Sequence, residues 1–302
     1  MKITKLHSRD SDGPDSAGTA GAYGGGISTP SWSYFVRSYR VAVASLALLA
    51  NVADAQVTDT VRRDKTFLTR RDLLWTGLAV GATGLMSIYD DDIARASQQP
   101  RWQDSSKHRL ALRISKVNET TLTVAGILSY GIARLAGNRT ATDIALHATE
   151  SVVLASLASQ VIRGPLGRSR PYVSKDTDQY NFKFGKGFSS FDYRAFPSIH
   201  TSSSMAVATV LTMELQRRHS DATPYVAPVL FAAGLLPGLA RIQLDQHWAS
   251  DVFAGALMGI FSGYKVVTYS HDHPNNFFDR TLLKVSVAPD PYGRLRIAFS
   301  PF

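Results

Sequence analysis

Cysteine is absent from all 302 positions of the sequence. This absence excludes disulfide bonds, thiolate metal sites and cysteine nucleophiles together. It does not exclude export, because many exported proteins of this size fold without disulfides. The sequence also has no zinc-finger spacing, no RNA-binding signature and no long basic run. Nucleic acid is therefore not expected as a partner.

Acidic residues are fewer than basic ones, with 24 Asp and Glu against 33 Lys and Arg and a formal net charge of +9. An excess of this sign favours anionic partners such as phosphates and acidic lipid headgroups. Hydrophobic residues make up 44% of the chain and charged residues 19%. These proportions are ordinary for a protein that folds around a sizeable core.

Residues 1–55 are predicted to be a leader and not part of a folded domain. Their first part is rich in Gly, Ser, Asp and Thr, and such a segment buries too little apolar surface to fold. A basic stretch with Arg37 and Arg40 then precedes a short apolar run, and Ala53 and Ala55 stand at positions −3 and −1 of a possible cleavage site. This order is typical of a secretory signal peptide. An uncleaved anchor or an ordinary N-terminal helix is the alternative.

Apolar segments of helical length dominate the rest of the chain. Six helices are predicted, over residues 73–89, 120–133, 144–162, 201–215, 222–240 and 252–268. A helix needs roughly 20 apolar residues to span a bilayer, and only 73–89 and 222–240 approach that length without a charge. The sequence alone therefore allows both membrane-spanning helices and the core of a soluble bundle.

The C-terminal segment 276–302 has a different pattern. Residues 284–287 and 294–299 alternate polar and apolar side chains around a Pro- and Gly-containing stretch at 289–293, which predicts a β-hairpin. A single hairpin cannot close a membrane barrel, so we expect it to pack on the helices. The predicted fold is mainly α: a bundle of about six core helices forms a domain over residues 56–275, and the C-terminal β-hairpin follows it.

Three short polar segments stand beside predicted helix ends. The first runs from Arg163 to Pro171 (RGPLGRSRP), and its glycine and proline at 164 and 165 are expected to end the preceding helix. The second, 196–201 (FPSIHT), opens the next helix. The third, 241–251 (RIQLDQHWASD), leads into the last long helix. These segments contain the candidate catalytic and ligand-binding residues.

The arginines and the helix start suggest a phosphate site. Arginine offers a planar fork of donors that matches phosphate oxygens, and it stays charged at any working pH. Arg163, Arg170 and Arg241 together can neutralise a dianion and the charge that develops during phosphoryl transfer. Ser198 stands at an N-cap position, and the free amides that follow it, beginning at Ile199, form an anion cradle at the positive end of the helix dipole.

Two histidines supply the reactive groups. His247 and Asp251 are four residues apart and share a face if the helix has already begun at His247. An aspartate bonded to one ring nitrogen fixes the tautomer and leaves the other nitrogen free to attack phosphorus. His200, on a separate helix, can protonate the leaving alcohol. Each feature is weak alone, and their joint occurrence carries the prediction.

In combination the three segments resemble the signature motifs of the type 2 phosphatidic acid phosphatase superfamily, which also includes bacterial acid phosphatases and vanadium haloperoxidases. The family patterns are K-x6-R-P, P-S-G-H and S-R-x5-H-x3-D. All spacings are matched, with Arg163 for the lysine, Ile199 for the glycine and Ala240 for the serine. The resemblance covers residues 73 to 268.

The resemblance implies a helical bundle and a phosphohistidine mechanism. By position, His247 is similar to the nucleophile, Asp251 to its orienting carboxylate and His200 to the acid. The phosphate clamp corresponds to Arg163, Arg170, Arg241, Ser198 and the amide of Ile199. The side chain of Ile199 would resist any backbone conformation that requires glycine, and Ala240 lacks a hydroxyl.

A metal-independent phosphatase without cofactor is therefore expected, acting on a phosphorylated lipid or a small phosphate ester. Its expected location is the periplasm, or a membrane with the active site facing the periplasm. A vanadate-dependent haloperoxidase, a lipid phosphotransferase and a non-catalytic binder of lipid phosphates remain as alternatives.

Three further features lie outside the motifs. The cluster at 90–92 (DDD) is taken as a solvated helix end in preference to a cation site. Residues 271–273 (HDH) are taken as an exposed loop in preference to a metal site. Residues 172–194 are long for a connection and are expected to form a lid or a substrate-selecting loop.

Overall fold

The structure is a computed structural model that describes residues 67–218, 220–282, 285–289 and 295–299. The predicted leader and signal peptide lie outside these residues. The described part is mainly helical, as predicted. Its helices are α2 (Arg70–Ser87), α3 (Asp90–Ser97), α4 (Ser105–Ile114), α5 (Glu119–Leu135), α6 (Arg139–Leu166), α7 (Pro171–Ser174), α8 (Lys186–Ser189), α9 (Ile199–Arg217), α10 (Thr223–Gln243), α11 (Ala249–Asp272) and α12 (Phe277–Leu282), with a 3-10 turn η1 (Phe191–Tyr193).

All six predicted helices are present, as α2, α5, α6, α9, α10 and α11. Polar caps define several of their starts: the side chains of Thr69, Asn118 and Asn138 accept hydrogen bonds from first-turn amides of α2, α5 and α6. The predicted end of α6 was wrong by a few residues. The helix continues through Pro165 and ends at Leu166, because Gly167 (φ 59°) adopts the left-handed C-cap conformation.

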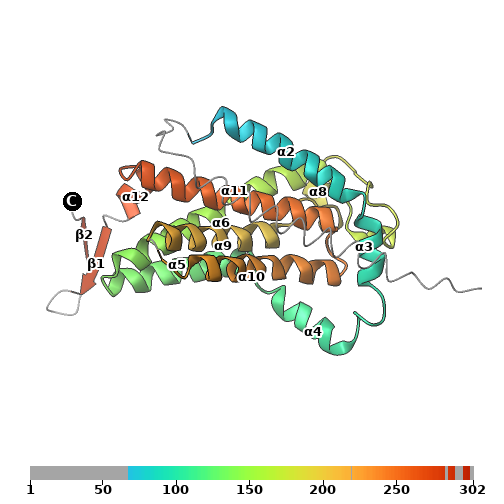
Figure 1. Ribbon diagram of the computed structural model, residues 1–302, viewed down its shortest axis with the longest axis horizontal. Helices are drawn as coiled ribbons and strands as arrows, with labels where there is room; N and C mark the ends of the chain where they lie inside the picture. Colours follow the sequence, from blue (N-terminus) through green and yellow to red (C-terminus); the bar gives the residue numbers. More distant parts are fainter. Residues whose placement is uncertain (1–66, 219, 283–284, 290–294, 300–302) are drawn as a thin grey trace, which may run out of the picture.

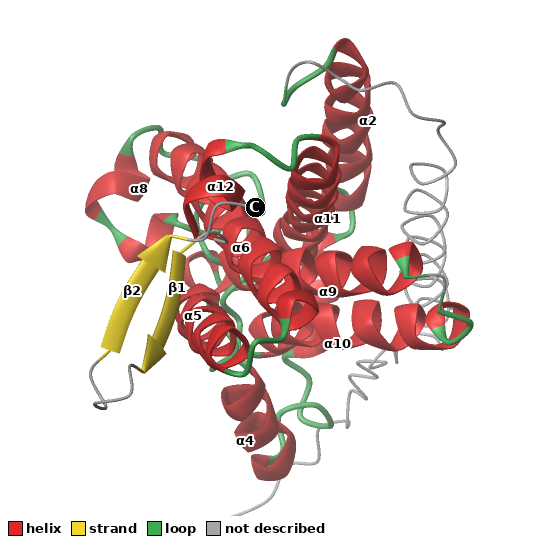
Figure 2. Cartoon of the chain, turned by 90° about the vertical axis from the view of Figure 1, so that its left-hand side faces the viewer, coloured by secondary structure: helices red, strands yellow, loops and turns green. Residues whose placement is uncertain are grey.

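Helix α9 lies at the centre of the bundle and packs against α11, α10 and α6 (Figure 1). Helix α5 covers α6, α2 lies along α11, and α4 projects from α10. A second view shows α9 between α11 and α10 (Figure 2). The core of this bundle is built largely from small side chains, and serine hydroxyls link α9 to α6: Ser202 lies 3.0 Å from Ser159, and Ser203 lies 3.1 Å from Ser156.

Glycines of α11 allow its backbone to touch that of α9. A Cβ atom at Gly255 would lie 2.4 Å from the Ser198 carbonyl oxygen, and one at Gly259 would lie 2.3 Å from that of Ser202. Contacts of this kind are typical of helices that associate through small residues inside membranes. They also fix the position of Ser198, the N-cap of α9.

The outer surface of the bundle is apolar. Leu74 of α2, Val161 of α6 and Val229 of α10 are 71%, 72% and 66% exposed. By length and composition, α6, α10 and α11 can each cross a membrane. Apolar side chains that face outward over several helices suit a lipid environment better than water.

The C-terminal segment begins with a helix that the sequence did not predict, α12. It is followed by strands β1 (Val285–Pro289) and β2 (Leu295–Phe299), which pair antiparallel with Val287 opposite Ile297. The connection 290–294 and the strand side chains lie outside the described part. The expected packing of a hairpin on the helices therefore remains a prediction.

The glycine contacts lead to a test of stability. Gly259→Ala should force α9 and α11 apart and lower the melting temperature by several degrees, since overpacking typically costs about 1–3 kcal/mol. Gly131→Ala is the matched control, because no atom lies within 4 Å of its Cβ position. Alanine there should be neutral or stabilising. Equal melting temperatures for the two variants would contradict the close packing.

Candidate active site

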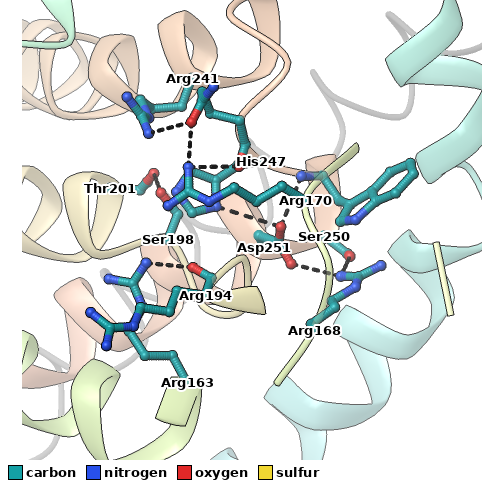
Figure 3. A network of polar contacts seen from close by, with 12 residues as sticks. Arg163, Arg168, Arg170, Arg194, Ser198, Thr201, Arg241, His247, Ser250 and Asp251 are labelled. Carbon is teal, nitrogen blue, oxygen red and sulfur yellow. Dashed lines mark hydrogen bonds and ion pairs between the residues drawn. The ribbon is translucent and has the colours of Figure 1, made fainter. Parts of the chain in front are cut away.

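The three polar segments meet at one end of the bundle (Figure 3). Arg163 comes from the last turn of α6 and Arg170 from the segment that follows it. Ser198 and Ile199 mark the start of α9, Arg241 lies in the last turn of α10, and His247 precedes α11. The structure thus brings all the predicted site residues together, although they span almost 90 positions of the chain.

The three predicted arginines surround His247 and are held by backbone and amide oxygens. Arg163 donates to the carbonyl of Arg194, and Arg170 donates to the carbonyl of Phe191 at 3.1 Å. Arg170 and Arg241 both donate to Gln246 Oε1, at 2.5 and 3.1 Å. Among the described residues, no carboxylate forms an ion pair with any of the three. Their charges are therefore available to an anion.

Burial, reinforced by the nearby charges of Arg241 and Arg163, lowers the pKa of Arg170 to about 9. Arg170 is only 1% exposed and still carries its charge at neutral pH. Its guanidinium also stacks on the ring of Phe191, 3.8 Å from the ring centroid. The fork is therefore fixed in position before any ligand arrives.

The start of α9 is shaped as the sequence predicted. Ser198 is the N-cap, yet its hydroxyl makes no capping bond and instead accepts a hydrogen bond from the Thr201 hydroxyl at 3.0 Å. The Ser198 O–H group and the first amides of α9 remain available as donors to an anion. Ile199 opens the helix, and in the described part only Lys175, Asp176 and Asp245 have a positive φ among non-glycine residues. Isoleucine therefore replaces the family's glycine without backbone strain.

His247 reaches Asp251 from outside the helix. Helix α11 begins at Ala249 with Trp248 as N-cap, so the two residues do not share a helical face in the way the spacing suggested. His247 Nδ1 lies 3.5 Å from Asp251 Oδ2, which also accepts the Trp248 backbone N–H at 2.8 Å. The His247 ring is 1% exposed, and neither nitrogen makes a hydrogen bond to a described residue. His247 Nε2 is thus a buried nitrogen without a hydrogen-bond partner among the described residues.

The carboxylate of Asp251 is oriented by a residue that the sequence analysis did not assign, Arg168. Arg168 donates to Asp251 Oδ1 at 2.6 Å and to Asp90 Oδ2 at 2.8 Å. Ser250 completes the group, because its backbone N–H donates to Asp90 Oδ1 at 2.8 Å and its hydroxyl accepts from Arg168 at 2.7 Å. All four residues are buried.

This group corrects the interpretation of 90–92 as a solvated helix end. Asp91 and Asp92 do face Arg95 at the surface, whereas Asp90 is fully buried because it neutralises Arg168. The available signal was the second arginine in the segment 163–171. The sequence could not show that its partner lies 78 residues earlier.

The segment 172–194 borders the site and carries α7, α8 and η1. Phe191 packs on Arg170, while Phe184 and Phe188 are 80% and 68% exposed. Exposed aromatic rings in a segment that borders the site are what the expected substrate-selecting loop would carry. Its closure as a lid remains a prediction.

The surroundings of both histidines disfavour the charged form of the ring. Burial, and then the charges of Arg241, His247, Arg163 and Arg170, lowers the pKa of His200 to about 2. Burial and the same three arginines lower the pKa of His247 well below its ordinary value. The His200 and His247 ring centroids are 6.5 Å apart, so an anion placed beside one also faces the other. A dianion would cancel the arginine charges and raise both pKa values.

Anion binding should therefore take up a proton. Sulfate, a dianion that does not itself titrate near pH 7, should bind the wild type with uptake of about one proton, and its affinity should fall as pH rises. Calorimetry in buffers of different ionisation enthalpy measures this uptake. His200→Asn should bind sulfate with the uptake largely removed. Uptake that is unchanged in this variant would assign the proton to another group.

Comparison with known proteins finds similarity in the region that contains the three polar segments. The family model described as the PAP2 superfamily matches residues 144–274. A lipid A 1-phosphatase of Porphyromonas gingivalis is 35% identical over 69 residues, which are 23% of this chain and 15% of that protein. A probable lipid phosphate phosphatase 4 of Arabidopsis thaliana is 35% identical over 112 residues, 34% of this chain and 33% of that protein.

A lipid A 1-phosphatase of Rhizobium etli is 26% identical over 121 residues, 40% of this chain and 48% of that protein. The chain thus spans less than half the length of each of these relatives. No solved structure matches. The region 144–274, which matches the model of the PAP2 superfamily, contains all three polar segments.

Proposed function

We propose that this protein is a metal-independent phosphatase that hydrolyses a lipid-linked phosphate monoester or diphosphate through a phosphohistidine at His247. The observation that carries the proposal is the buried ring of His247. Its Nε2 has no hydrogen-bond partner among the described residues, an aspartate lies at Nδ1, and three arginines lie around it. Such a group matches the charge and geometry of phosphoryl transfer to nitrogen.

The first step forms a bond between phosphorus and His247 Nε2 and breaks the bond between phosphorus and the leaving oxygen. Neutral His247 attacks with its lone pair, and Asp251 stabilises the positive charge that the ring acquires. The leaving oxygen takes a proton from His200, which gains that proton when the dianion binds. Water then attacks phosphorus, and the bond between phosphorus and His247 Nε2 breaks with its electron pair returning to the ring. The attacking water gives a proton to His200, which loses it when the phosphate dianion leaves, so that both histidines regain their neutral starting states.

The clamp of Arg163, Arg170 and Arg241, with Ser198 and the amide of Ile199, holds the three non-bridging oxygens in this scheme. Arg168 acts through another residue: it holds Asp251 and never touches the phosphate. The argument for a non-catalytic binder rested on distortion at Ile199, and the unstrained start of α9 removes that argument.

A lipid substrate is supported by two independent observations. The relatives are named lipid A 1-phosphatase and lipid phosphate phosphatase, and α6, α10 and α11 can each cross a membrane. The exposed rings of Phe184 and Phe188 beside the site can contact acyl chains. We therefore propose a membrane location with the site facing the periplasm, and a phosphatase domain over residues 56–275.

Replacing the nucleophile tests the central step. His247→Ala should reduce phosphate release by more than about 10⁴-fold, because no neighbouring group can replace the attacking nitrogen. Acid-quenched wild type, mixed with labelled substrate, should carry a phosphoryl group that is labile in acid and stable in base, and the variant should carry none. Normal turnover by the variant would contradict the assignment.

Replacing the acid tests the proton transfer. His200→Ala should lose about 10²–10⁴-fold in kcat with an alkyl phosphate and far less with a nitrophenyl phosphate, because only the alkoxide needs a proton to leave. The ratio of kcat for the two substrates, measured in both proteins, isolates this effect. Equal losses on both substrates would make His200 a phosphate ligand only.

A further inference from the structure

A second cluster of polar side chains lies at the opposite end of the bundle. His147 of α6, Glu214 of α9 and His271 of α11 meet there, and Asp279 of α12 joins them. His147, Glu214 and Asp279 are 3%, 1% and 4% exposed. Helix α12 lies at this end in Figure 1. The opposite end, where α8 lies, carries Arg163, Arg170, Arg241 and His247 and is called the phosphate end below.

The ligand-type atoms of this cluster are close enough to share one ion. Glu214 Oε1 lies 2.9 Å from His147 Nδ1 and 2.8 Å from His271 Nε2, and the three atoms all fall within 4.8 Å of one another. Zinc binds imidazole nitrogen and carboxylate oxygen at about 2.0–2.2 Å, which places neighbouring tetrahedral ligands about 3.3 Å apart. Two of the observed separations lie about 0.5 Å below this value, and the third is at most 4.8 Å.

Each carboxylate of the cluster has one oxygen fixed and the other directed at a histidine. Arg218 donates to Glu214 Oε2 at 2.7 Å, and this leaves Oε1 for the two rings. Asn276 donates to Asp279 Oδ2 at 2.6 Å, while Asp279 Oδ1 lies 3.9 Å from His147 Nε2. Hydrogen bonds to the other atoms of a ligating side chain are usual at metal sites, because they orient the atom that binds the metal.

Two buried polar atoms of the cluster lack a hydrogen-bond partner in the described part of the chain. His147 Nε2 and Asp279 Oδ1 face each other, and neither has a hydrogen-bond partner among the described residues. If a metal occupies His147 Nδ1, the ring proton moves to Nε2, and Asp279 Oδ1 becomes its acceptor. A carboxylate behind a metal-bound histidine is the common arrangement at zinc sites, and it accounts for both atoms.

We propose that His147, Glu214 and His271 bind one divalent transition-metal ion of the zinc type. Two imidazole nitrogens and one carboxylate oxygen supply three ligands, and water completes the coordination. The side chain of His271 is 33% exposed and provides the entry path. Asp143 and Glu150 of α6 lie close enough to interact electrostatically with His147.

The metal ties helices together and takes no part in phosphate chemistry. His147 and Arg163 are 16 residues apart on α6, or about 24 Å at the rise of an α-helix. Chelation should therefore leave the rate of phosphate release unchanged while it removes the ligand bond between α6, α9 and α11. This result also separates the metal site from the phosphatase site, because each can fail without the other.

Metal content and cobalt spectra test the proposal. Full-length protein without a histidine tag, stripped with EDTA, should bind about one equivalent of Co²⁺ with the visible absorption of four-coordinate cobalt. Zn²⁺ should compete for the same site and raise the melting temperature by about 5 °C. Asp279→Asn should weaken Co²⁺ binding by about 10–100-fold, because the carboxylate that accepts a hydrogen bond from His147 is lost.

His271→Gln should abolish the cobalt spectrum while the far-ultraviolet circular dichroism stays that of the wild type. His273→Gln is the matched control, because His273 stacks on Tyr269 at 4.4 Å and takes no part in the cluster. It should bind Co²⁺ as the wild type does. Stripped wild type that binds no Co²⁺, or a His271→Gln variant that binds it normally, would overturn the proposal.

Discussion

Arg168 shares one guanidinium between Asp251 and Asp90, and the phosphate end of the bundle depends on this buried interaction. It connects the segment after α6 with the start of α11 and with α3, at 2.6 and 2.8 Å. Because the carboxylates are also bonded to Ser250 and the Trp248 amide, the group is fully paired. A buried charge without its partner typically costs 3–5 kcal/mol. The orientation of His247 therefore depends on Arg168, Asp251 and Asp90 together, because loss of any one of them leaves a buried charge without its partner.

The two ends of the bundle gather different polar side chains. At one end Arg163, Arg170 and Arg241 have neutral acceptors as their partners, so positive charge remains for an anion. At the other end Glu214 and Asp279 face two histidines, and these side chains are of the kinds that bind a metal cation. Helices α6, α9 and α11 each contribute to both ends. The same small-residue packing that brings α9 against α11 therefore positions both sets of side chains.

The helices could be predicted from the sequence because they depend on short-range patterns. The convergence of the site residues could be predicted because three segments, in order and spacing, resemble the motifs of a known family. His200, Arg170 and Asp251 stand at fixed distances from helix ends, and helix ends are marked by capping residues, glycine and proline. Asp90 and Arg168 could not be paired, since a contact across 78 positions leaves no local signal.

His271 was assigned to an exposed loop because Pro274 follows it closely, whereas α11 continues to Asp272. The roles of the site residues and the packing of the C-terminal strands remain predictions.

Gln246 gives the phosphate end a resident ligand of its own. Its amide oxygen accepts from both Arg170 and Arg241. Under the proposed function, an incoming phosphate would therefore replace one acceptor by another, and the amide oxygen would return to the arginines as inorganic phosphate leaves. A neutral side chain next to His247 would thus compete with the product for the same two guanidinium groups.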